Sequence, residues 1–137
     1  MIRRLIVFAI VPFLFFSPEQ AHSSIDPSEV LVVVNTREPI SQKVADYYCA
    51  KRRVPAKNIC KISCTTTESV NADEFTTSIM RPIESYLQST FGSDPAKPGS
   101  DPIKAILLTY GVPSVIIHGE RLASVNSCLA LTFNQTP

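Results

Sequence analysis

The sequence predicts an α/β fold with three layers, in which helices cover both faces of a mainly parallel sheet. The run VLVVVN (30–35) is continuously apolar and β-branched until its final Asn, as expected for a strand buried on both faces. Two further apolar runs, 58–63 and 103–110, alternate with segments of helical periodicity. The order βαβαβα stops as its last helix begins, so we expect an incomplete doubly wound domain.

The first predicted helix runs from about Ile40 to Arg53. The turn Thr36-Arg37-Glu38-Pro39 precedes it, and Val54-Pro55 ends it, because a residue before Pro disfavours the helical region. Four apolar residues recur on one face at helical spacing, and this periodicity predicts the packing face of the helix: Ile40, Val44, Tyr47 and Tyr48.

A second predicted helix begins at Asn71, which forms a capping box with Glu74. Pro82 lies inside this helix and should kink it, because its ring excludes one backbone hydrogen bond. TTTES (65–69) before the helix and FGSDPAKPGSDP (91–102) after it are predicted loops. A third helix is predicted from Ser124 to Phe133. The apolar stripe of the second helix contains Phe75, Ile79, Ile83, Tyr86 and Leu87.

The predicted strand order has 30–35 in the centre, 58–63 at one edge and 103–110 on the other side. The last strand then has a bare, apolar edge. Because such edges pair readily with other strands, we expect edge-strand association or a missing C-terminal part to cover it.

The N-terminus has the pattern of a signal peptide. Arg3 and Arg4 precede the apolar stretch LIVFAIVPFLFF (5–16), and Ala21-His22-Ser23 offers small residues for cleavage near Ser23. The sequence thus predicts a signal peptide (1–23), an exported product (24–137) that forms one α/β domain, and no stable membrane span after cleavage. An uncleaved N-terminal anchor is the alternative.

The charge balance gives no indication of nucleic-acid binding. The chain has 13 basic and 12 acidic residues, and removal of Arg3, Arg4 and Glu19 leaves 11 of each. The one basic cluster, Lys51-Arg52-Arg53 with Lys57, follows the first helix, where it complements the helix dipole and should point to solvent. Partners are otherwise unknown from the sequence, and no motif predicts a cofactor.

Four cysteines follow the signal peptide, which in an oxidising compartment permits two disulfides. Cys49 with Cys60, or Cys64 with Cys128, are the more accessible pairs. A zinc site from Cys60, Cys64, Cys128 and His118 has no usual ligand spacing, so no metal site is predicted.

Ligands of open parallel sheets bind beyond the carboxyl ends of the strands, and this edge is the candidate site. At the third strand, Gly111 allows the chain to turn and Pro113 fixes the exit direction. The start of the third helix offers free N–H groups. The candidate ligand-binding residues are Asn35, Thr36, Tyr110, Gly111, Ser124 and Asn126.

Several segments together carry a resemblance to a known family: LVVVNTREPISQKVADYYCAKRRVPAKNI, the helix ending in MRPIESYL, ILLTYGVP and ASVNSCLALTF. Over residues 30–133 the chain resembles the N-terminal part of an uncharacterised exported bacterial family. That family occurs in genomes with exosortase and its PEP-CTERM protein-sorting system. It has no established activity, so the resemblance implies no catalytic residue.

The sequence departs from this family in two respects. Family members continue well beyond this point, which predicts a truncated chain. The family usually has Asp where this sequence has Asn126, so the charge of that position is lost here.

Three functional hypotheses follow. The first is an exported binding or accessory component of envelope or extracellular-matrix assembly. The second is a hydrolase related to caspase-like cysteine peptidases, in which His118 of VIIHGE would activate Cys128. Against it, Cys128 follows His118 by only ten residues and lies in a predicted helix, where a buried or disulfide-linked thiol is expected. The third is a truncated copy without function.

Overall fold

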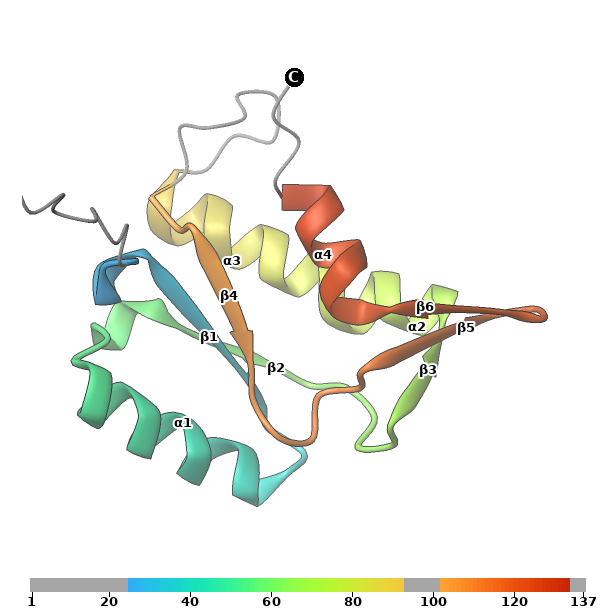
Figure 1. The fold of residues 1–137 in the computed structure, drawn as a ribbon, viewed down its shortest axis with the longest axis horizontal. Helices are drawn as coiled ribbons and strands as arrows, with labels where there is room; N and C mark the ends of the chain where they lie inside the picture. The colour runs from blue at the N-terminus through green and yellow to red at the C-terminus, as the bar shows by residue number, and fades with distance from the viewer. Residues whose placement is uncertain (1–24, 93–101, 134–137) are drawn as a thin grey trace, which may run out of the picture.

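Three parallel strands form the larger sheet of the computed structural model, which describes residues 25–92 and 102–133. The strand β1 (Val30–Asn35) lies in the centre, β2 (Ile59–Ile62) on one side and β4 (Ala105–Leu108) on the other (Figure 1). Both the α/β class and the predicted order of these strands are confirmed. The third strand is shorter than the predicted range 103–110.

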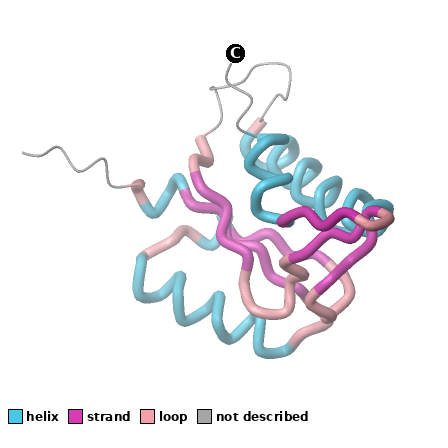
Figure 2. The backbone as a smooth tube through the Cα atoms, turned by 45° about the vertical axis from the view of Figure 1, so that its right-hand side comes forward, coloured by secondary structure: helices cyan, strands magenta, loops and turns pink. Residues whose placement is uncertain are grey.

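Helices cover both faces of this sheet, as predicted. The helix α1 (Pro39–Arg52) lies on one face, and α3 (Arg81–Phe91) and α4 (Val125–Phe133) lie on the other (Figures 1 and 2). Short 3-10 turns, η1 (Pro27–Glu29) and η2 (Ala56–Asn58), precede β1 and β2.

The two faces of β1 supply two separate hydrophobic cores. Val30, Val32 and Val34 pack against α1, whereas Leu31 and Val33 pack on the side of α3 and α4. This division follows from the pleat, because successive side chains of a strand point to opposite faces. All six residues of β1 are buried, and each buried Val or Leu contributes about 1.5–3 kcal/mol of hydrophobic free energy.

The predicted packing face of α1 is wrong for three of its four residues, since only Tyr48 packs against the core. Ile40, Val44 and Tyr47 are 50%, 41% and 69% exposed, and Tyr48 is only partly buried. The helix instead buries three small residues at a spacing of four: Ser41, Ala45 and Cys49. Small side chains let the helix axis lie close to the valines of β1, and the longer apolar side chains are then directed to the flanks.

The second predicted helix is continuous but contains a π-helical turn. It begins with α2 (Ala72–Phe75), widens in η3 (Thr76–Met80) and ends as α3. Here the N–H of Arg81 donates to the carbonyl oxygen of Thr76, five residues earlier. The wider turn lies immediately before Pro82, where the sequence predicted a kink, and it accommodates a residue that has no N–H. The predicted stripe is confirmed: Phe75, Ile79, Ile83 and Leu87 are buried, and Tyr86 packs against them.

A second, smaller sheet is present that was not predicted from the sequence. It contains β3 (Ser69–Asn71), β5 (Val115–His118) and β6 (Arg121–Ser124), in the order β3-β5-β6. β3 pairs with β5 in parallel, and β5 and β6 form an antiparallel hairpin in which Gly119 has a φ of +61°. Ser124 therefore ends a strand, and the third helix begins one residue later than predicted.

Some predictions concern parts of the chain outside the described residues. These are the signal peptide (1–23) with its cleavage site and most of the loop 91–102. Within 25–92 and 102–133, no helix combines the length and apolar character that crossing a membrane requires.

Candidate functional site

The carboxyl edge of the larger sheet, where the sequence predicted a ligand site, contains a buried hydrogen-bond network. Asn35, Ser41 and Thr109 are 0%, 0% and 5% exposed. The backbone N–H of Asn35 donates to Oγ of Ser41 at 2.9 Å, and this Oγ lies 2.6 Å from Oγ1 of Thr109. Oγ1 of Thr109 donates to the carbonyl oxygen of Val33 at 2.7 Å, so Ser41 is the donor in the bond between the two hydroxyls. The network fastens the start of α1 to the ends of β1 and β4.

The side-chain amide of Asn35 binds three stretches of backbone. Nδ2 donates to the carbonyl oxygen of Gly111 at 2.7 Å and to those of Cys64 and Thr65 at 3.2 Å each. Oδ1 accepts from the backbone N–H of Arg37 at 3.1 Å and from that of Cys64 at 3.3 Å. The amide therefore holds together the connections that follow β1, β2 and β4, and all of its polar atoms have partners within the chain.

Gly111 closes the same edge from the third strand. Its φ is +84°, which favours glycine, and an ideal Cβ at this position would lie 2.5 Å from Cγ of Glu38. Glu38 is the N-cap of α1, and its side chain accepts a hydrogen bond from the N–H of Ile40. Pro113, two residues further along, is buried. The turn is thus sharp because the chain passes directly over the start of α1.

The other four predicted ligand residues lie in different settings. Thr36 donates from its N–H and its Oγ1 to the carbonyl oxygen of Ile62, at 2.8 and 3.1 Å. Tyr110 is 64% exposed beside the closed edge. Ser124 ends β6, and its Oγ accepts from the N–H of Ser127 at 3.4 Å. Asn126 lines a groove on the other side of β4. The structure thus brings Asn35 and Gly111 into contact and places Asn126 at a separate hollow; ligand binding by these residues stays a prediction.

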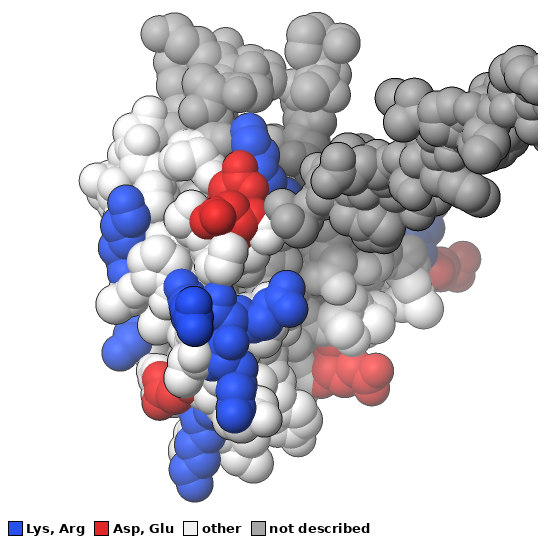
Figure 3. All heavy atoms as spheres, turned by 60° about the vertical axis from the view of Figure 1, so that its left-hand side comes forward, with Lys and Arg blue, Asp and Glu red and all other residues white. Residues whose placement is uncertain are grey.

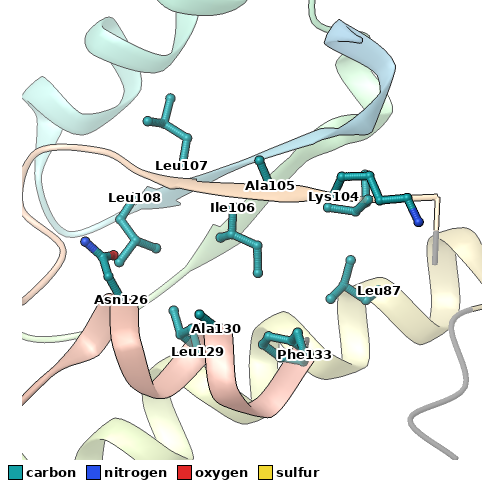
Figure 4. Close-up of a pocket in the computed structure, with 11 residues that line it drawn as sticks. Leu87, Lys104, Ala105, Ile106, Leu107, Leu108, Asn126, Leu129, Ala130 and Phe133 are labelled. Atoms are coloured by element: carbon teal, nitrogen blue, oxygen red, sulfur yellow. The ribbon is translucent and has the colours of Figure 1, made fainter. Parts of the chain in front are cut away.

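That hollow is an apolar groove between β4, α3 and α4, with a volume of about 370 Å³. Ile106 and Leu108 of β4 point toward α4, and Leu129, Ala130 and Phe133 point back from α4 (Figure 4). Leu87 of α3 lies at one end. The size and the apolar lining are typical of sites that bind a small ligand or an apolar side chain. Of these residues only Asn126 was identified from the sequence as a site residue, although the apolar character of both α4 and β4 was a usable signal.

The groove lies at the free edge of the larger sheet. In the described part of the chain, β4 pairs with β1 on one side only, so the backbone groups on its outer side have no strand partner there. All four residues of β4 are apolar, and all four remain partly exposed, whereas every residue of β1 is buried. The bare apolar edge predicted from the sequence is therefore present among the described residues.

The structure places His118 and Cys128, the dyad of the peptidase hypothesis, in different settings. His118 ends β5 at the tip of the hairpin and lines an open hollow with Asp73 and Glu74, to which Cys128 does not contribute. Cys128 lies on α4, partly buried against the core on that side of the sheet. Activation of a thiol requires the imidazole within hydrogen-bond distance, and the described contacts contain no such bond between these two residues.

All four cysteines are free thiols in the structure. Cys49 packs in the core under α1 and Cys60 in the core on the opposite face, so the sheet separates these two residues, and the expectation that they form one of the more accessible pairs is wrong. Cys64 and Cys128 belong to the same core.

Burial raises the pKa of Cys60 to about 12 and that of Cys64 to about 11, and Glu74 makes a smaller contribution at Cys64. These raised pKa values make both thiols poor nucleophiles. Among the described residues, no three His, Cys, Asp or Glu side chains form a group able to hold a metal ion.

The basic cluster lies at the end of α1, as predicted. Lys51 and Arg52 are in its last turn, and they are exposed together with Arg53 and Lys57. Figure 3 shows Lys and Arg side chains gathered on one face of the molecule, with acidic side chains around them. This mixture of charges is typical of a solvated surface.

No protein-family model, curated protein or solved structure matches this chain.

Proposed function

We propose that this chain is an exported docking component of envelope or extracellular-matrix assembly, and that it binds an apolar segment at the free edge of β4. One observation carries the proposal: an apolar groove of about 370 Å³ runs beside a strand whose four residues are all partly exposed. Such a strand gains hydrophobic burial and backbone hydrogen bonds when another segment covers it.

Two further observations support a docking role at this site. The signal-like N-terminus suggests that the chain acts outside the cytoplasm, as does its resemblance to an exported family. The carboxyl edge of the sheet, which is the usual ligand site of such folds, is closed by the amide of Asn35 and by Glu38 over Gly111. The groove is therefore the better candidate.

Binding of Nile red, a neutral apolar dye, to the exported product of the full chain tests this function. Ala130 is exposed and lines the groove, so A130W should fill it and weaken dye binding about tenfold, a loss of about 1.4 kcal/mol. The matched control is L131W at the adjacent, 71% exposed position outside the groove lining, which should bind dye like the wild type.

The chain has no Trp, so indole fluorescence gives a second readout. The indole of A130W should emit at shorter wavelength than that of L131W, because the groove is apolar. Equal dye binding by the two variants, or no dye binding by the wild type, contradicts the proposed function.

A further inference from the structure

The edge of β4 lacks three of the features that usually prevent pairing with another strand. Natural edge strands are protected by charged residues, by Pro or by a bulge. The strand AILL (105–108) contains no charged residue and no Pro, and it pairs with β1 in an unbroken register. It is only four residues long, and this shortness, which is a protective feature of natural edge strands, limits the strength of any contact.

The groove beside this edge is polar at both ends and apolar between them. Lys104 lies at one end, next to the start of β4, and Asn126 lies at the other end, next to Leu108 (Figure 4). Both residues are exposed. A surface with this order of groups is complementary to itself when a second copy is turned by 180°, because each Lys104 then approaches an Asn126.

We propose that the occupant of the groove is β4 of a second copy of this chain, paired antiparallel across a two-fold axis. The inference rests on the proposed function, since it names the partner of the same groove. In an antiparallel pair, opposing residues point to the same face of the sheet. With Ile106 opposite its own counterpart, Ala105 faces Leu107 of the partner subunit, so a small side chain meets a large one.

The same register explains both ends of the groove. Lys104 then lies opposite Leu108 of the partner subunit and beside Asn126 of the partner subunit, whose amide oxygen accepts a hydrogen bond from the ammonium group. Ile106 and Leu108 of each copy still point toward their own α4, and they lie on the same face of the joined sheet as their counterparts in the other copy. Removal of the predicted signal peptide leaves 11 basic and 11 acidic residues, so net charge does not oppose association.

Sedimentation velocity over a concentration series of the exported product tests the inference. The wild type should change from monomer to dimer as its concentration rises. N126K places two Lys side chains at each end of the interface and should raise the dissociation constant at least about tenfold. K104E/N126K restores opposite charges and should bring the dissociation constant back to the wild-type value or below it.

L131K is the matched control, because it adds the same charge to α4 at an exposed position outside the groove lining, and it should leave association unchanged. Circular dichroism verifies the fold of each variant. A wild type that stays monomeric throughout the series overturns the inference, as does a failure of K104E/N126K to recover association. If the wild type stays monomeric but A130W binds Nile red less well than the wild type, the proposed function stands and only the inference of a second copy fails. If the wild type stays monomeric and A130W binds Nile red as well as the wild type, both proposals are overturned.

Discussion

Asn35 is the residue on which the carboxyl edge of the sheet depends most. It is fully buried, and its Nδ2 donates to three backbone carbonyl oxygens that belong to two different connections. The donors matter here, because a buried carbonyl that loses its partner incurs the full desolvation cost.

N35D should therefore destabilise the protein by about 3–5 kcal/mol at neutral pH, since a carboxylate cannot donate and would be buried without a counter-charge. N71D is the matched control: Asn71 only accepts a hydrogen bond, from the N–H of Glu74, and an Asp N-cap does this equally well. Urea unfolding measures both changes. Equal stability of N35D and N71D would show that the amide donors of Asn35 contribute little.

The buried thiols of Cys60 and Cys64 predict a loss of stability at alkaline pH. Burial raises the pKa of Cys60 to about 12 and that of Cys64 to about 11 in the folded chain. The unfolded chain ionises at the ordinary thiol pKa of about 8.5. The stability that the thiol forms contribute is fully present below that value, and it is lost as the pH rises through the folded pKa values, by up to about 1.4 kcal/mol per pH unit for each thiol.

The measurement is urea unfolding between about pH 8 and about pH 11 for the wild type and for C60A/C64A. The variant starts less stable because each substitution leaves a cavity, but its stability should fall less steeply with pH. Parallel pH profiles would mean that the two thiols are not the groups responsible.

At the residue scale, the sequence indicated which residues gather at the sheet edge but not what they do there. Asn35, Thr36 and Gly111 were identified from their positions at strand ends, and the structure places them at that edge. Their hydrogen bonds to other parts of the chain depend on distant segments such as the start of α1, and no local pattern in the sequence records those contacts.

At the scale of the elements, helical periodicity predicted the second helix well and α1 poorly. The stripe from Phe75 to Leu87 faces a deep core, so large apolar residues mark its buried side. α1 packs against a flat layer of valines, so Ser41, Ala45 and Cys49 face the sheet, and the more apolar Ile40 and Tyr47 lie outside. Hydrophobicity alone selects the wrong face when close approach favours small side chains.

The hairpin of β5 and β6 was missed although the sequence contains a signal for it. Two short segments, VIIH and RLAS, are separated by Gly119-Glu120, and a two-residue turn with Gly is a strong indication of a hairpin. The alternation in these segments is weak because β6 is exposed along its length. β4 was predicted correctly as an edge strand. Its apolar residues favour a strand, and its place as the outer strand of three leaves one of its sides without a strand partner among the described residues.

At the scale of the whole molecule, the fold class and the order of the larger sheet followed from the alternation of buried strands with helices. The second sheet and the groove did not, because both arise where α4 and the hairpin pack beside elements that are far away in the sequence. Among residues 25–92 and 102–133, the usual ligand edge of the sheet is thus closed, and the outer side of β4 has no strand partner.

Hydrogen exchange of the segment 103–109, measured on residues 24–137 at low and high protein concentration, tests self-association through β4 most directly. We predict that amide exchange in this segment slows as the concentration rises, because the outer N–H groups of β4 become paired. Exchange in β1, which is buried on both faces and paired on both sides, should stay the same. Exchange of 103–109 that is independent of concentration would contradict the claim that the free edge of β4 is a surface for self-association.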